Sequence, residues 1–280
     1  FKMDKYSFPF ARKEPFVSVL SDFGCAYSCT FCPISTLGFK LRQIPEVIDE
    51  IRSAKELGAK ELHFRDQTFG INKPRTKEFC EALKPLGLGW SAWTRVDVLN
   101  DELLQTMKDA GCHTIIFGVE TSNEEILKAY KKNTKQSQII EAMDLCKKNG
   151  IRTVGTFIIG LPGETKETVE ATIRFSKGIN LDFAVFNIAT PRFGTTFRKE
   201  AIEKGWIDGS KREIESSQSK PVFTNTGITN EEIFELQRRA IREFYLRPGK
   251  ILKKITDVRS FDEFVKHARN GWALLFNKAT

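Results

Sequence analysis

Three features that would assign this chain of 280 residues to a membrane or to the secretory pathway are missing. No apolar run is long enough to span a bilayer, and the first residues do not pair a basic segment with an apolar one, as a secretory signal does. Six cysteines are too few for a secreted disulfide scaffold of this length. These absences favour a cytoplasmic protein without a transmembrane segment. The chain begins at Phe1 rather than Met, so we expect that a longer protein was trimmed before it.

A run of charges of one sign is also missing, although the formal net charge is +8. A positive balance attracts anionic partners such as phosphorylated molecules, nucleic acid or lipid headgroups. Here basic residues stand among acidic ones, as at Lys199-Glu200 and Arg242-Glu243, and such mixing is typical of a solvated surface. We therefore do not expect nucleic acid to be the partner.

Short β-rich runs alternate with longer helical stretches from residue 16 to residue 204. Six strand–helix units follow one another with no hairpin signal between them, which predicts a parallel sheet with right-handed crossovers. Six units are too few to close an eight-stranded barrel. We expect an α/β fold, a partial (β/α)6 parallel barrel with its helices outside. The strands are predicted at residues 16–20, 61–64, 89–94, 114–119, 152–159 and 182–189.

The character of the sequence changes after about residue 205. Residues 208–230 are polar and predict a connector, whereas residues 231–245 have the apolar spacing of an amphipathic helix. We expect a lead-in over residues 1–15, a core over residues 16–204 and a helical C-terminal extension over residues 205–280. The extension is expected either to cover the barrel mouth or to close the open side of the barrel.

Three cysteines stand within eight residues, directly after the first predicted strand, in the pattern C-x3-C-x2-C: Cys25, Cys29 and Cys32. In βα folds the chemistry belongs to the loops at the carboxyl ends of the strands. Thiolates are the ligands of iron–sulfur clusters, and three thiolates for four irons leave one iron open to a small molecule. The remaining cysteines are far apart in apolar surroundings and are predicted to be buried hydrophobic residues: Cys80, Cys112 and Cys146.

A zinc site is the alternative interpretation of the three cysteines, completed by His63, His113 or Cys112. Zinc sites usually use paired C-x2-C knuckles, and the sequence has no second knuckle. Unliganded buried cysteines are a further alternative. Gly24 and Thr30 argue against it, because they belong to a polar loop without a core pattern.

The cysteine pattern, with Phe31 in the aromatic position before the last cysteine, resembles the motif of the radical S-adenosylmethionine (SAM) superfamily. The resemblance implies a 4Fe–4S cluster held by the three cysteines, with SAM bound at the open iron. It also implies reductive cleavage of SAM to a 5′-deoxyadenosyl radical, which abstracts hydrogen from the substrate.

Segments after the second and third predicted strands extend the resemblance. Asp66, Gln67 and Thr68 stand where superfamily members receive the SAM amino group, although Asp66 or Thr68 could instead cap a helix. Arg95 ends the third strand, where its fork can bind a carboxylate or phosphate. A salt bridge from Arg95 to Asp97 or Asp66 is the structural alternative.

The next two strands carry further residues that the resemblance places at SAM. Glu120 ends the fourth strand in a Gly-Val-Glu segment and is expected to accept hydrogen bonds from ribose hydroxyls. Lys132 stands where a basic residue pairs with the SAM carboxylate, and a surface lysine is the alternative. The fifth strand and its turn, with Thr156, Gly160 and Gly163, resemble the segment that lines the adenine and ribose.

Three segments resemble the cobalamin-associated branch of the superfamily, at residues 66–69, 160–165 and 244–248. That branch contains methyltransferases and ring-forming cyclases, so the resemblance implies methylation or ring formation on an unknown substrate. No histidine stands in the Asp-x-His-x-x-Gly loop of a cobalamin domain. Either cobalamin is expected from a domain or partner absent from this chain, or the chain works without it. A small-molecule or lipid-like substrate and a reductant such as flavodoxin or ferredoxin are also implied. A methylthiotransferase-like modifier is a minor alternative, because it needs a second cysteine cluster.

Overall fold

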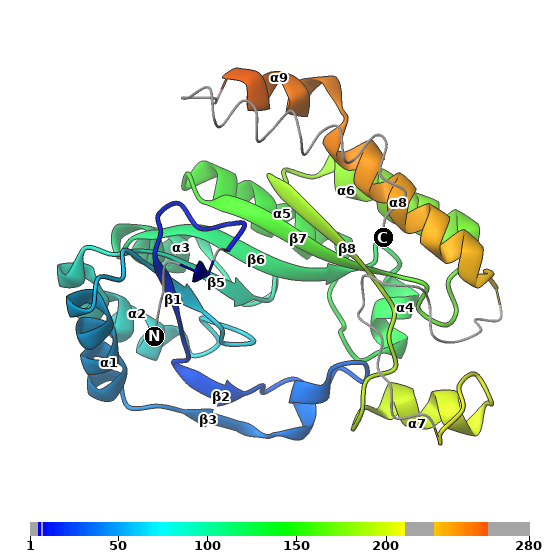
Figure 1. Ribbon diagram of the computed structural model, residues 1–280, viewed down its shortest axis with the longest axis horizontal. Coiled ribbons are helices and arrows are strands. Elements are labelled where there is room, and N and C mark those ends of the chain that lie inside the picture. Colours follow the sequence, from blue (N-terminus) through cyan, green and yellow to red (C-terminus); the bar gives the residue numbers. More distant parts are fainter. Residues whose placement is uncertain (1–4, 7, 211–226, 257–280) are drawn as a thin grey trace.

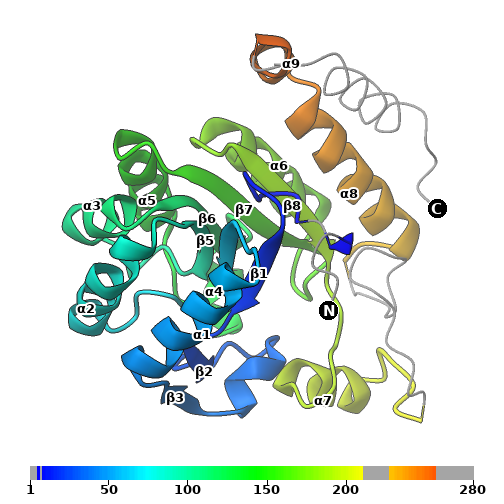
Figure 2. The ribbon, with the colours of Figure 1, turned by 60° about the vertical axis from the view of Figure 1, so that its left-hand side comes forward.

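The structure, a computed structural model, describes residues 5–6, 8–210 and 227–256. Its main element is a six-stranded sheet in the order β1-β4-β5-β6-β7-β8, and every neighbouring pair is parallel. The sheet is curved, and the helices that connect its strands lie along the convex side (Figures 1 and 2). The expected partial barrel is therefore confirmed. The strands are β1 (Phe16–Val19), β4 (Glu61–Phe64), β5 (Gly89–Thr94), β6 (Cys112–Glu120), β7 (Arg152–Ile159) and β8 (Phe183–Ile188).

The connecting helices begin and end where local signals in the sequence place them. The Asn100 side chain accepts a hydrogen bond from the backbone nitrogen of Leu103 at 3.0 Å and so starts α3. Gly58 follows α1 with a φ of 99°, a conformation that favours glycine and ends the helix. The helices of the core are α1 (Ile44–Glu56), α2 (Lys73–Leu83), α3 (Asp101–Asp109), α4 (Glu124–Ala129), α5 (Gln136–Lys148), α6 (Lys166–Gly178) and α7 (Thr196–Glu203).

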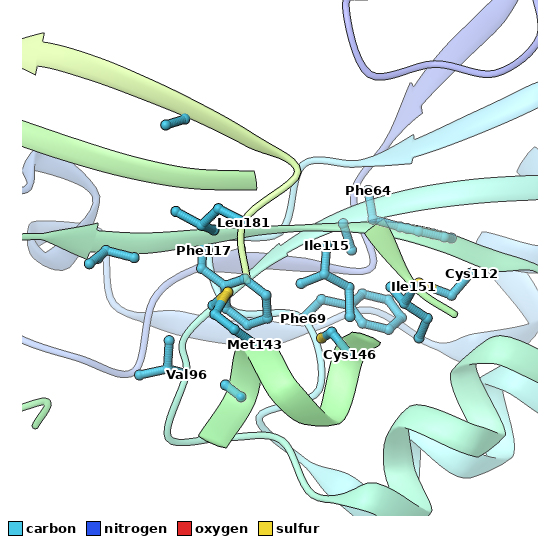
Figure 3. Close-up of a cluster of buried hydrophobic side chains, with 14 of the residues drawn as sticks. Phe64, Phe69, Val96, Cys112, Ile115, Phe117, Met143, Cys146, Ile151 and Leu181 are labelled. Carbon is cyan, nitrogen blue, oxygen red and sulfur yellow. The ribbon is translucent and has the colours of Figure 1, made fainter. Parts of the chain in front are cut away.

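The hydrophobic core lies between the convex face of the sheet and these helices. Figure 3 shows Ile115 and Phe117 of β6 near Met143 and Cys146 of α5, and all four belong to one buried group. The cysteines outside the motif are fully covered here, so their prediction as buried hydrophobic residues is confirmed: Cys80, Cys112 and Cys146. This core fixes the outer face of each strand and leaves the inner face for function.

The concave face of the sheet is less completely filled. Burial alternates along β8, where Ala184, Phe186 and Ile188 are buried and the residues between them are half-buried. Trp93 of β5 and Ile158 of β7 are also half-buried in the middle of the sheet. Because successive side chains of a strand point to opposite faces, the half-buried residues line the interior of the partial barrel. Trp93 and Ile158 lie towards its carboxyl end.

The lead-in segment closes the other end of the barrel interior. The backbone nitrogens of Arg12 and Lys13 donate to the buried Glu61 carboxylate at 2.7–2.9 Å. Arg152 donates to the carbonyl oxygen of Phe10 at 2.8 Å, and the Phe8 ring lies 4.1 Å from the ring of His63. The amino ends of the strands are therefore covered, and the open mouth lies at their carboxyl ends.

One element was not expected from the sequence. β2 (Asp22–Gly24) and β3 (Phe39–Leu41) pair antiparallel in a separate two-stranded ribbon within the connection from β1 to α1. Strands of three residues are too short to show alternation. Gly24 has a φ of 77°, and a Cβ there would lie 1.8 Å from the carbonyl oxygen of Gly38. The close approach of the two strands thus requires glycine at this position.

The predicted amphipathic helix after the core is α8 (Asn230–Tyr245), followed by α9 (Pro248–Thr256). The Tyr245 hydroxyl donates to the carbonyl oxygen of Ala184, and the Gln237 amide donates to that of Phe186, each at 2.8 Å. These contacts satisfy backbone groups at the edge strand β8, beside which α8 runs in Figure 2. Residues 211–226 of the predicted connector and everything after residue 256 lie outside the described residues. Within the described ranges, no helix is long and apolar enough to cross a membrane.

Candidate active site

The cysteine loop follows β2 and lies against segments that leave the carboxyl ends of several strands. The sulfur of Cys25 lies 3.6 Å from the hydroxyl of Thr68, which follows β4. The sulfur of Cys29 lies 3.7 Å from Nη1 of Arg95, which follows β5, and 3.9 Å from the carbonyl oxygen of Lys131 after α4. The fold therefore brings the cysteine motif and these segments, which are far apart in sequence, to one edge of the sheet.

The three thiols of this loop are free, and they differ in exposure. Cys29 is 7% exposed, whereas Cys25 and Cys32 are half-buried. Burial raises the pKa of Cys29, and the nearby cations Lys132 and Arg95 oppose that rise. Burial also raises the pKa of Cys32. The backbone N–H groups of Ile34 and Ser35 oppose that rise, and the neighbouring Cys25 adds to it. Iron must displace these protons when it binds, and Lys132 and Arg95 favour the Cys29 thiolate that results.

The donor set fits an iron–sulfur cluster better than a single metal ion. Across the described part of the chain, no three His, Cys, Asp or Glu side chains converge closely enough to hold one ion, and a cluster of four irons takes its thiolates from more widely spaced positions. The alternative zinc ligands lie elsewhere. Cys112 and His113 begin β6 at the closed end of the barrel, and His63 forms its contacts with Ser91 and Trp93 inside it. The zinc interpretation therefore has no geometric support.

Asp66 is fully buried and organises the start of the cysteine loop. Its carboxylate accepts hydrogen bonds from the backbone and hydroxyl groups of Ser21 and from the backbone nitrogen of Asp22. Burial raises the pKa of Asp66. The pKa of Asp22 is also raised, chiefly by burial and to a smaller extent by the negative charge of Asp66. The alternative role of Asp66 or Thr68 as a helix cap was wrong, because the next helix, α2, is capped by Asn72. Gln67 is exposed and donates to the carbonyl oxygen of Arg65.

Glu120 and Lys132 are neighbours in the structure, and both are buried. Lys132 Nζ lies 2.9 Å from Glu120 Oε1, so the two residues expected at SAM form an ion pair with each other. Glu120 stands at a bulge of β6 with a φ of 67°, which is uncommon for a residue other than glycine. Gly118 leaves room for the pair, since a Cβ there would meet Glu120 Oε1 at 2.4 Å. Backbone strain of this kind is concentrated at functional sites.

The Glu164 carboxylate holds the turn after β7. Glu164 was not predicted from the sequence as a residue of the site. Gly160 and Gly163 have φ values of 89° and 93°. Glu164 accepts from the backbone nitrogens of Gly160 at 2.7 Å and Leu161 at 3.1 Å. Within the described part of the chain its other oxygen has no well-formed hydrogen bond, although the Thr121 hydroxyl is near. Thr156 lies earlier on β7, where its hydroxyl donates to the carbonyl oxygen of Phe117.

Glu164 makes the stability of the protein depend on pH. Burial raises its pKa from an ordinary 4.5 to about 7, against the two backbone donors that lower it. Between these pH values the native state holds a proton that the unfolded state has lost, so the free energy of unfolding falls as pH rises from 4.5 to 7. Between pH 4.5 and pH 8, this proton should lower the free energy of unfolding of the native protein by up to about 3 kcal/mol. Glu164→Gln should lack this decrease, as measured by urea unfolding at the two pH values. Glu167→Gln, at an exposed neighbour, is the control and should leave the fall in place. Equal pH dependence in Glu164→Gln and the native protein would contradict the assignment.

Phe31 belongs to an aromatic group that holds the cysteine loop against α4 and α7. Its ring lies 6.1 Å from that of Tyr130, which lies 5.8 Å from Phe197. Thr30 donates to the carbonyl oxygen of Tyr130 and accepts from the backbone nitrogen of Phe197. Tyr130 was not expected from the sequence, because nothing in its local pattern distinguishes it from an ordinary helix end. Tyr27, whose ring lies against the guanidinium of Arg95, was also not predicted as a site residue. Its position between Cys25 and Cys29 could have indicated it.

A cavity of about 620 Å³ lies away from this site. Its walls come from the carboxyl ends of α5 and α6, from the loops that lead into β7 and β8, and from Arg247 and the first turn of α9. The cysteine loop contributes nothing to it. We therefore place the candidate active site at the carboxyl edge of the sheet and not in this cavity.

The sequence comparisons agree with this site. The family model of the radical SAM superfamily matches residues 22–176, more than half of the chain, and the chain therefore belongs to this superfamily. Membership implies an enzyme with a 4Fe–4S cluster and SAM as cofactors. The match begins at β2 and includes the cysteine loop, the segments after β4 and β5, the Glu120–Lys132 pair and the Gly160 turn.

Two curated methyltransferases are similar along most of the chain. An uncharacterized methyltransferase of Pyrococcus horikoshii is 37% identical over 284 residues, which cover 99% of this chain and 60% of that protein. Cytidylyl-2-hydroxyethylphosphonate methyltransferase of Streptomyces wedmorensis is 26% identical, over 88% of this chain and 49% of that protein. The chain thus spans about half to three fifths of the length of these relatives.

Two solved structures share the fold. The radical SAM methyltransferase TsrM of Kitasatospora setae, with tryptophan and a SAM analog bound, has a TM-score of 0.64 at 19% identity, over 84% of this chain and 52% of that one. The cobalamin-dependent radical SAM enzyme OxsB has a TM-score of 0.66 at 17% identity, over 89% of this chain and 44% of that one. At these identities the likeness concerns the fold alone.

Proposed function

We propose that this chain is the catalytic core of a radical SAM methyltransferase that works with cobalamin from a domain or partner outside the chain. The observation that carries the proposal is the convergence of three free thiols, a buried arginine and a buried Glu–Lys pair at the open edge of the sheet. The 37% identical relative over nearly the whole chain is named a methyltransferase. The cobalamin-dependent enzyme with the same fold supports the choice of second cofactor.

Several candidate residues then have a proposed part at the cofactors. Cys25, Cys29 and Cys32 hold the iron. When bound, the cluster and SAM supply one-electron cleavage of the SAM sulfonium and a methyl group for transfer. Glu120 accepts hydrogen bonds from the ribose hydroxyls, and Lys132 binds the SAM carboxylate. Their ion pair permits both roles, because the Glu120 carboxylate has a second oxygen and the Lys132 ammonium has further N–H groups.

The remaining candidates shape the site around these groups. The Gly160–Gly163 turn and Thr156 lie along the adenine, where glycine allows close backbone approach. Asp66, Gln67 and Thr68 form the wall beside Cys25, and Phe31 shields the cluster from water. The half-buried interior residues Trp93 and Ile158 favour a small-molecule or lipid-like substrate over a polymer. A flavodoxin or ferredoxin in the cytoplasm is the proposed electron donor.

The experiment is anaerobic purification of the protein followed by iron and sulfide analysis. We expect about four irons and four sulfides per chain, and a SAM-dependent product after reduction with dithionite and addition of hydroxocobalamin. S-adenosylhomocysteine, measured by mass spectrometry, reports methyl transfer, whereas 5′-deoxyadenosine alone reports hydrogen abstraction as in a cyclase. A protein that holds stoichiometric zinc and no iron would refute the proposal. Formation of 5′-deoxyadenosine without S-adenosylhomocysteine would contradict methyl transfer and favour a cyclase.

A further inference from the structure

The guanidinium of Arg95 connects three segments of the site and is itself only 5% exposed. It forms a two-pronged salt bridge with Asp97, at 3.0 Å and 2.8 Å, and donates to the carbonyl oxygen of Lys132 at 2.7 Å. Its plane lies over the Tyr27 ring, 3.8 Å from the ring centre. Its remaining nitrogen, Nη1, points to the sulfur of Cys29 at 3.7 Å.

These contacts leave Arg95 little capacity to bind a ligand of its own. An arginine has five N–H donors, and four of them have partners here, in Asp97, Lys132 and Cys29. The fork that would grip a carboxylate or phosphate is occupied by Asp97. The salt-bridge alternative from the sequence therefore describes Arg95 better than a ligand-binding role does.

We propose that Arg95 is a positioning residue that donates a hydrogen bond to the Cys29 thiolate and thereby raises the reduction potential of the iron–sulfur cluster. The inference rests on the proposed function, because it requires a cluster on Cys29. Cys29 is the appropriate target, since it is the most deeply buried of the three ligands. An N–H···S bond is strongest in such a water-poor place.

The direction of the effect follows from charge. One-electron reduction adds negative charge to the cluster and its sulfurs, so a donor to sulfur stabilises the reduced state more than the oxidised state. Asp97 neutralises the net charge of Arg95, so the effect comes from the directed N–H group rather than from a general positive field. Tyr27 holds the guanidinium plane and so keeps Nη1 aimed at Cys29.

The test is the midpoint potential of the loaded, SAM-free protein, measured by redox titration with electron paramagnetic resonance. Arg95→Met, which lacks a donor, should lower the equilibrium constant for one-electron reduction about tenfold, a shift of about 59 mV to more negative potential. Arg95→Lys keeps the charge beside Asp97 but loses the fork, and we expect a shift in the same direction. Lys60→Met, on the exposed surface before β4, is the control and should leave the potential unchanged.

Each outcome has a distinct meaning. If the native protein holds no cluster, the proposed function fails before this inference is reached. If the native protein and both variants hold equal iron and have equal potentials, the inference alone is overturned. Loss of iron from both variants overturns it as well, since Arg95 would then hold the loop in place rather than set the potential.

Discussion

Cys29→Ala is expected to abolish cluster binding and SAM cleavage while most of the fold remains. The three thiolates are the iron ligands we propose, and loss of one leaves too few to hold a cluster with a single open iron. Cys29 is buried beside Arg95, and no strand or helix of the core depends on its side chain. The same result is expected for Cys25→Ala and Cys32→Ala. Iron content, visible absorption and 5′-deoxyadenosine formation measure the effect, and circular dichroism reports the fold.

A matched control for these variants is Cys80→Ala. Cys80 lies in α2 and is 1% exposed within the hydrophobic core. Its loss removes one buried sulfur and costs packing energy, but it should leave iron content and activity at the native level. Full cluster content and activity in Cys29→Ala would show that the ligands are wrongly assigned. Loss of iron in Cys80→Ala alone would have the same consequence.

Glu120→Gln is expected to raise the SAM dissociation constant at least tenfold in the reconstituted protein. Hydrogen bonds to a charged group contribute about 1.5–3 kcal/mol, and about 1.4 kcal/mol corresponds to a factor of ten. The variant also leaves the Lys132 ammonium buried without its carboxylate. Breaking a buried ion pair in this way costs about 3–5 kcal/mol of stability. Isothermal calorimetry and urea unfolding measure the two effects separately.

A double variant separates ligand binding from stability. Glu120→Gln with Lys132→Met removes both charges, so no uncompensated charge remains and most of the lost stability should return. SAM affinity should stay low in the double variant, because neither the carboxylate for the ribose hydroxyls nor the ammonium for the SAM carboxylate is present. Recovery of SAM affinity together with stability would show that the pair is structural only.

Much of the fold was predictable from local patterns. β4, β5 and β7 have the predicted bounds, because Gly and charged residues mark their ends in the sequence. β6 begins two residues earlier than predicted, at Cys112, since Cys and His carry no strong strand preference. The β2–β3 ribbon was missed because its pairing depends on contact between residues 22–24 and 39–41, which no local period reports.

The composition of the site was also predictable, but the partners of its charged residues were not. Arg95 and Glu120 stand at or directly after a strand end, and Lys132 follows the helix after β6, as the sequence placed them. That Lys132 meets Glu120 and that Arg95 meets Cys29 depends on the α4–α5 loop folding back over the sheet edge. Glu164 is the clearest omission, because its role arises from two backbone N–H groups in the turn before it. The available signal was the position of Glu164 directly after this turn, where the N–H groups of Gly160 and Leu161 need an acceptor.

The sequence by itself determined the order of strand–helix units and which three thiols are proposed as ligands. Both follow from short-range information: periodicity decides which face of each element is apolar, and three cysteines within eight residues must share one loop. Only the tertiary structure decided which charges face one another and that α8 covers the edge of β8. The reason is physical. Pairing of buried charges and satisfaction of an open strand edge depend on distances between segments that only the packed core sets.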